Sequence, residues 1–176
     1  LGNDVYEWGQ GRNRGKVDTY AQADGERARE LHDRLDGAPV TMIGWSLGGV
    51  IARETARLHA PYVREVITMG TPVLGGPKYT TVAERFAESD NIDLDEFEKK
   101  VHARNLEGIS QPITSIYSKL DGVVGWRASV DSYNAHARNI EVYSSHFGIG
   151  AHGRVWRLIA DTLAGSGENC AGSDVL

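Results

Sequence analysis

One serine in this chain stands in a pattern typical of an enzyme nucleophile. Residues 44–48 read G-W-S-L-G, with a short apolar run over 40–43 before them and a helical pattern after them. G-x-S-x-G between a strand and a helix places the serine hydroxyl at the top of a sharp turn. We expect Gly44 and Gly48 to remove side chains that would collide across this turn. We also expect Ser46 to have a strained backbone, with its hydroxyl clear of the sheet.

A serine hydroxyl needs a base to become nucleophilic, and the base needs an acid to orient it. In this arrangement the partners follow the serine in the order acid, then histidine. Asp121 follows a predicted strand ending at residue 117, and His146 follows one ending at residue 143. Both lie where parallel strands end, which is where ligands bind in such sheets. The sequence therefore predicts Ser46 as nucleophile, Asp121 as acid and His146 as base, with Trp45 as a residue that lines the pocket.

Other residues compete for these roles with weaker support. Asp131 is an alternative acid, and His136 and His152 are alternative bases. Cys170 lies in a polar tail and reads as an incidental exposed thiol. The histidines lack metal-ligand spacing, and the glycines over 9–15 have the wrong spacing for a dinucleotide loop. We therefore predict neither a metal nor an organic cofactor.

Composition excludes several other classes. The chain has 176 residues, 40% of them hydrophobic and 24% charged, which is typical of one globular domain. A net charge of −5 argues against nucleic-acid binding. A single cysteine excludes an internal disulfide. No transmembrane segment or signal-peptide pattern is present, which favours a cytoplasmic location, although the chain begins at Leu1 and reads as a processed or truncated product.

The elements that must position these residues alternate along the chain. The patterns predict five strands, over 4–8, 40–43, 63–69, 112–117 and 139–143. They predict helices over 18–36, 50–60, 81–88, 94–105 and 154–163. This alternation favours an α/β fold with a mostly parallel sheet and helices on both faces. We expect residues 1–176 to form a single domain that ends in a flexible tail over 165–176.

These segments together resemble the α/β-hydrolase-fold serine esterases and lipases, in particular bacterial lipase-like proteins. The resemblance runs over about residues 4–163 and rests on the segments 8–15, 43–54, 66–72, 117–124 and 144–148. It implies carboxylester hydrolysis through Ser46, Asp121 and His146, with the N–H of Leu47 as one donor of the oxyanion hole.

The resemblance also implies two features beyond these motifs, namely further N-terminal strands and a cap over the site. Such proteins have further strands before this point, including a loop that gives the second oxyanion donor. We therefore expect either a truncated N-terminus or a reduced hydrolase whose site is completed differently. An edge left by absent strands invites pairing, so we expect a homo-oligomer or a partner segment there. Residues 74–111, rich in charge, are expected to form a small helical cap or lid, whose apolar residues either face the pocket or only pack its helices onto the core.

Three functions follow from these observations. The first is a serine carboxylesterase acting on a small-molecule or lipid ester through an acyl-enzyme on Ser46. The second keeps the fold but transfers the acyl group to another acceptor, or acts on lipids as a lipase. The third is a non-catalytic, hydrolase-like binding protein, because the second oxyanion donor is not evident.

Overall fold

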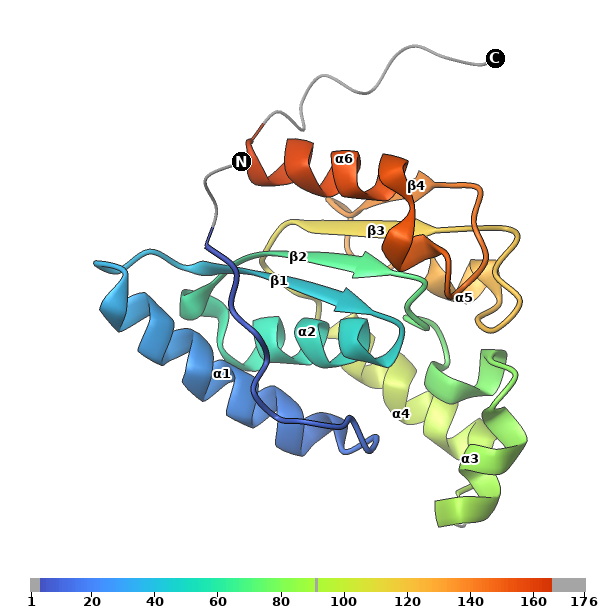
Figure 1. Cartoon of the computed structure of the whole chain (residues 1–176). Helices are drawn as coiled ribbons and strands as arrows, with labels where there is room; N and C mark the ends of the chain where they lie inside the picture. The colour runs from blue at the N-terminus through green and yellow to red at the C-terminus, as the bar shows by residue number, and fades with distance from the viewer. Residues whose placement is uncertain (1–3, 91, 166–176) are drawn as a thin grey trace.

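A parallel sheet of four strands forms the centre of the protein (Figure 1). The computed structural model describes residues 4–90 and 92–165. The strands lie in the order β1-β2-β3-β4, and each neighbouring pair is parallel. They span Val40–Trp45 (β1), Val63–Met69 (β2), Ile113–Tyr117 (β3) and Arg138–Glu141 (β4). Because all four strands run the same way, their carboxyl ends meet at one edge, where the loops that carry the candidate residues begin.

Helices cover both faces of this sheet, as the α/β fold predicted. Helices α1 (Val17–Arg34) and α2 (Leu47–Leu58) lie on one face, and α6 (Gly153–Leu163) lies on the other (Figure 1). Each face has its own buried core, because successive side chains of a strand point to opposite faces. In β2, Val66 packs with Ala52 and Ala56 of α2, whereas Ile67 packs with Val155 and Ile159 of α6.

Helix α1 supports α2 from outside through a very close contact. Gly25 of α1 leaves room for the His59 ring, which a Cβ atom on Gly25 would meet at 1.9 Å. The hydroxyl of Thr55 in α2 lies 3.4 Å from the carbonyl of Ala21. Beyond its end, α1 is closed by Gly37, which has φ +84° and donates its N–H to the His32 carbonyl.

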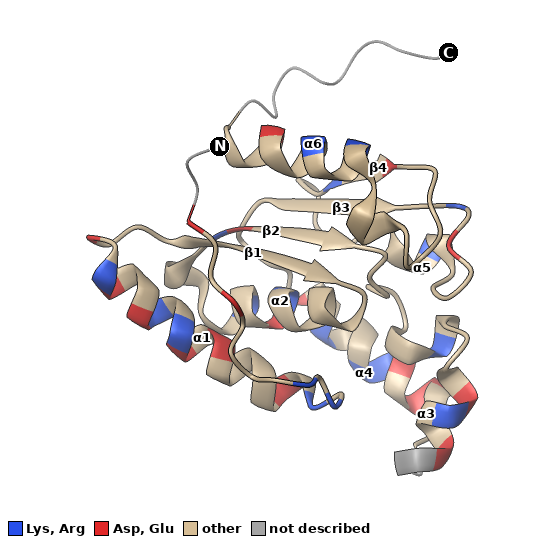
Figure 2. Ribbon diagram, viewed as in Figure 1, with Lys and Arg blue, Asp and Glu red and all other residues tan. Residues whose placement is uncertain are grey.

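The region predicted as a cap holds two helices, α3 (Ala83–Asp90) and α4 (Leu94–Leu106), after a 3₁₀ turn, η2 (Gly76–Tyr79). The rings of Phe86 and Phe97 pack edge to face, 5.6 Å apart. Phe97 also lies so close to Gly76 that a Cβ there would meet it at 3.0 Å. Phe86 and Phe97 therefore pack the elements of this region together. Charged residues are frequent in α1, α3 and α4 and sparse in the strands (Figure 2).

Two sequence expectations about the ends of the chain have different outcomes. The strand predicted over residues 4–8 is wrong, because this segment pairs with no strand in the described part of the chain and lies along α1, where Trp8 packs against Tyr20 at 5.1 Å. Alternating residues form a strand only where a neighbour supplies the ladder of hydrogen bonds.

The tail beyond residue 165, with Cys170, lies outside the described residues. No helix in the described part is both long and apolar enough to cross a membrane.

Candidate active site

Ser46 lies in the turn between β1 and α2, as its motif predicts. Its backbone has φ +53° and ψ −124°, a conformation that costs a non-glycine residue about 1–3 kcal/mol. The Ser46 N–H donates to the carbonyl of Met69 at the end of β2, 2.8 Å away. A Cβ atom on Gly44 would come within 2.4 Å of the Cα of Gly49. The absence of a side chain at Gly44 therefore permits the turn.

The reason given for the second glycine of the motif is wrong. A Cβ atom on Gly48 would meet nothing within 4 Å outside its own helix and chain neighbours. The crowded position is Gly49, where a Cβ would lie 2.0 Å from the hydroxyl oxygen of Thr71. Thr71 is fully buried and belongs to the segment after β2. Gly49 thus allows this segment to pack against the first turn of α2.

Asp121 and His146 meet beyond the ends of β3 and β4. The Nδ1 atom of His146 lies 2.7 Å from Oδ2 of Asp121, and the two side chains are 4% and 1% exposed. The other carboxylate oxygen accepts the N–H groups of Val123 and Val124, both at 2.9 Å. The carboxylate is therefore fixed by its own loop, and the imidazole presents Nε2 as its remaining nitrogen.

Two neighbours of this pair were not assigned to it by sequence reasoning. Gly70 follows β2 with φ +53°, and a Cβ there would lie 2.9 Å from Oδ2 of Asp121 and 3.2 Å from Nδ1 of His146. The only sequence signal was the G-T-P that closes this strand. Trp45, expected to line a pocket, donates its indole N–H to the His146 carbonyl at 3.1 Å.

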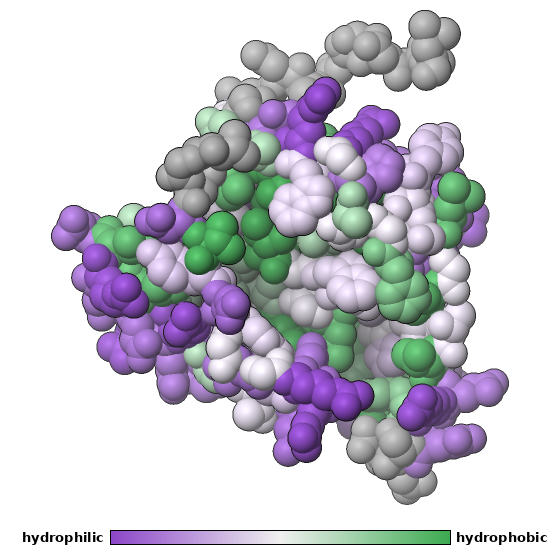
Figure 3. All heavy atoms as spheres, in the orientation of Figure 1, coloured by the Kyte–Doolittle hydropathy of each residue, from purple (hydrophilic) through white to green (hydrophobic). Residues whose placement is uncertain are grey.

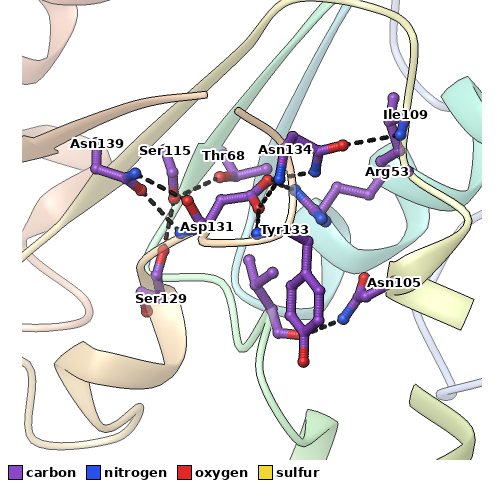
Figure 4. A network of polar contacts seen from close by, with 12 residues as sticks. Arg53, Thr68, Asn105, Ile109, Ser115, Ser129, Asp131, Tyr133, Asn134 and Asn139 are labelled. Carbon is purple, nitrogen blue, oxygen red and sulfur yellow. Dashed lines mark hydrogen bonds and ion pairs between the residues drawn. The ribbon is translucent and has the colours of Figure 1, made fainter. Parts of the chain in front are cut away.

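The rival residues lie elsewhere. The Asp131 side chain is completely buried and lies 2.5 Å from the Arg53 guanidinium of α2. Burial alone would raise the pKa of Asp131, but Arg53 and Asn134 hold that pKa below its usual value. These residues belong to a polar network that joins α2 to the segment over 129–139 (Figure 4). His136 pairs with the carbonyl of Gln111, and His152 is the residue before α6.

The start of the predicted cap is tied to the loop that holds Asp121. Thr81 donates its backbone N–H to the carbonyl of Val123, and Gly125 donates to the carbonyl of Tyr79, both at 2.9 Å. A shallow groove of about 310 Å³ runs along this pair of segments, with Thr80, Thr81 and Asp121 in its lining. Within residues 4–90 and 92–165, no three acidic, histidine or cysteine side chains gather as metal ligands would.

Comparison with known proteins agrees with the fold. The model of a family described as having the alpha/beta hydrolase fold matches residues 9–98, half of the chain. The chain belongs to the α/β-hydrolase family. The match includes the turn that carries Ser46 and the start of the region predicted as a cap.

Solved α/β-hydrolase structures share the fold at low sequence identity. A lipase of Bacillus licheniformis in its mature form has a TM-score of 0.62 and 16% identity, over 84% of this chain and 74% of that one. A lipase-esterase related protein from Clostridium acetobutylicum has a TM-score of 0.58 and 16% identity, over 86% and 77%. An alpha/beta hydrolase enzyme from a lagoon-sediment metagenome has a TM-score of 0.58 and 17% identity, over 90% and 74%. No curated protein matches the sequence significantly.

Proposed function

We propose that this protein is a serine carboxylester hydrolase that works through an acyl-enzyme on Ser46. The proposal rests above all on the buried hydrogen bond between Asp121 and His146, at 2.7 Å, and His146 also contacts Trp45, the residue before Ser46. A buried carboxylate that accepts from Nδ1 fixes the imidazole tautomer and orientation that a general base requires. Helix-initial amide groups at the same turn favour a developing negative charge.

Each residue has a defined part in the proposed reaction. Ser46 Oγ attacks the ester carbonyl carbon while its proton passes to Nε2 of His146. The negative charge on the carbonyl oxygen is met by the N–H of Leu47, the first residue of α2. His146 then gives the proton to the departing alcohol as the C–O bond breaks. Water, activated by the same imidazole, attacks the acyl-enzyme and releases the acid, so Ser46 is regenerated.

Hydrolysis of p-nitrophenyl butyrate by the purified chain tests this proposal. We expect turnover in the wild-type chain and none above background in Ser46→Ala. Ser110→Ala is the matched control, because Ser110 is exposed and its hydroxyl donates to the side chain of the neighbouring Gln111. A fluorophosphonate probe should label the wild-type chain and leave the Ser46→Ala variant unlabelled. Turnover that survives in Ser46→Ala, or a wild-type chain that neither turns over ester nor takes the probe, contradicts the proposal.

The region over 74–111 is proposed to act as a cap that selects the substrate. Lys78 of η2 contacts Asp95 and Glu98 of α4, at 2.7 and 2.5 Å, so η2 and α4 are held together. Because residues 79–81 pair with the loop of Asp121, a change of position in the cap reaches the candidate acid directly. The proposed substrates are small-molecule or lipid esters.

The free edge of β1 is proposed to pair with a second copy of the chain. Within the described residues β1 has a partner strand only on the β2 side. Ile43 is 45% exposed, and hydrophobic residues gather on the surface in front of β1 and β2 (Figure 3). An exposed apolar edge is a template for strand pairing. Light scattering of the wild-type chain should give a dimer mass that falls to a monomer mass in Ile43→Lys, and a monomeric wild type contradicts this proposal.

A further inference from the structure

The side chain of Trp45, which precedes Ser46, contacts the candidate base on both its ring and its backbone. The indole N–H donates to the His146 carbonyl at 3.1 Å, across 101 residues of sequence. The centroids of the indole and imidazole rings lie 5.2 Å apart at an angle of 38°. Phe147 packs edge to face against both rings, at 5.9 Å from Trp45 and 5.6 Å from His146.

We propose that Trp45 is a positioning residue that fixes the imidazole of His146 relative to Ser46. This inference rests on the proposed function of Ser46 and His146. It adds Trp45, which contacts the base His146 but takes part in no bond that forms or breaks. Its side chain links His146 to the strand that ends just before Ser46.

The backbone of Trp45 is held by the sheet. Trp45 is the last residue of β1 and lies opposite Met69 of β2 in the strand register. The next residue, Ser46, donates its N–H to the carbonyl of the same Met69 at 2.8 Å. The backbone of Trp45 is therefore fixed relative to Ser46. Its indole contacts His146 and so fixes the histidine loop relative to Ser46 as well.

Other contacts hold the loop of His146 at its two ends, where the Ser144 N–H donates to the Ser118 hydroxyl at 3.1 Å and Ile149 is buried, whereas the indole of Trp45 binds the carbonyl of His146 itself. His146 lies beyond β4, a strand of four residues at the edge of the sheet. Asp121 fixes Nδ1, which sets the ring tautomer and one distance. A single hydrogen bond still allows the ring to swing about it, whereas the bond to the His146 carbonyl and the ring packing fix both ends of the residue.

Exposure and chemistry separate this role from ordinary core packing. Trp45 is 40% exposed, so burial in the core is not its main contribution to the structure. Trp156 of α6 offers a matched control, because it is 57% exposed and its described hydrogen bond comes from its backbone. Both tryptophans are partly exposed, and of the two it is Trp45 whose ring and indole N–H contact His146.

The test compares Trp45→Phe, Trp45→Ala and Trp156→Phe by ester kinetics and by proton NMR. In the Ala variant we expect kcat to fall about 10²-fold with KM within about twofold, as for a misplaced catalytic group. In the Phe variant, which keeps a ring but loses the hydrogen bond, we expect a fall of about fivefold. Trp156→Phe should match the wild type.

The NMR measurement follows the proton between Nδ1 of His146 and Asp121, which resonates far downfield and is assigned by its loss in His146→Gln. We expect this signal to broaden or disappear in Trp45→Ala and to persist in Trp45→Phe and Trp156→Phe. A wild-type signal in Trp45→Ala, or a change in KM alone, overturns the inference. If Trp45→Ala does not fold, unchanged kcat in Trp45→Phe overturns it. Turnover that persists in Ser46→Ala refutes the proposed function instead, and the NMR comparison still decides the role of Trp45.

Discussion

Gly70 offers a sharp test of how tightly the candidate site is packed. It follows β2 with φ +53° and lies against the Asp121–His146 pair. In Gly70→Ala the new Cβ would start 2.9 Å from Oδ2 of Asp121 and 3.2 Å from Nδ1 of His146. Both side chains are almost fully buried, at 1% and 4% exposure, so neither can turn into solvent. The alanine therefore has to displace the pair itself.

Two separate costs follow from this geometry. Alanine in a left-handed backbone conformation loses about 1–2 kcal/mol of folding free energy. A carbon-to-oxygen contact of 2.9 Å must open by about 0.5 Å to reach the usual range. If a displacement of about 1 Å costs about 10²-fold in rate, half of it costs about tenfold. We expect Gly70→Ala to lose about 1–2 kcal/mol of stability and at least about tenfold in kcat.

Two other glycines separate these costs. Gly11 has φ +66° with nothing within 4 Å of a Cβ, so Gly11→Ala should lose stability alone. Gly122, next to Asp121, has an ordinary φ and open space, so Gly122→Ala should change neither quantity appreciably. Urea unfolding gives the stability of each variant and p-nitrophenyl butyrate gives its kcat. A Gly70→Ala enzyme with wild-type kcat, or a Gly11→Ala enzyme as slow as Gly70→Ala, would refute the reasoning.

Three further outcomes can be checked by unfolding or kinetics. Burial, opposed by Arg27, raises the pKa of Asp24 from 3.8 to about 6, so its ionisation destabilises the fold as pH rises through that window. Asp24→Asn should therefore gain up to about 3 kcal/mol above pH 6 and nothing near pH 3.5, in urea titrations at both pH values. Arg53→Met leaves the buried Asp131 carboxylate without its cation and should cost about 3–5 kcal/mol by urea unfolding. Gly49→Ala should lower kcat through the Thr71 contact, whereas Gly48→Ala should retain it.

Local sequence patterns predicted most of the helices and strands, because the hydrophobic spacing that marks each element lies within that element. The bounds predicted for β2 agree with the structure, those of α1 differ by one residue at its start and two at its end, and α4 differs by one residue at its end. The same patterns failed over residues 4–8, where alternation alone indicated a strand. A strand also needs a neighbour, and no local pattern reports whether one is present.

The same limit applies to the candidate site: residues marked by local patterns could be predicted, and contacts between distant segments could not. The strand-to-helix turn at Ser46 could be predicted because a local motif marks it and Gly44 permits it. The meeting of Asp121 and His146 could be predicted because parallel strands bring their loops to one edge. The contacts among these loops could not be found in the same way. Gly49 and Gly70 are glycines because of atoms that lie far away in sequence. Their neighbours exist only after the sheet has assembled.

The contacts that form only after the sheet has assembled also determine how precisely Ser46, Asp121 and His146 are placed. Motif residues place each group at the correct edge of the sheet, to within the freedom of a loop. Residues 69–71, at the end of β2 and directly after it, lie between these groups. The Met69 carbonyl accepts the Ser46 N–H, Gly70 lies against Asp121 and His146, and Thr71 packs on Gly49. Catalysis by a serine and a base requires placement within a fraction of an ångström. In the proposed mechanism, residues 69–71 therefore set that distance, which is why Gly70→Ala should slow the reaction as well as destabilise the fold.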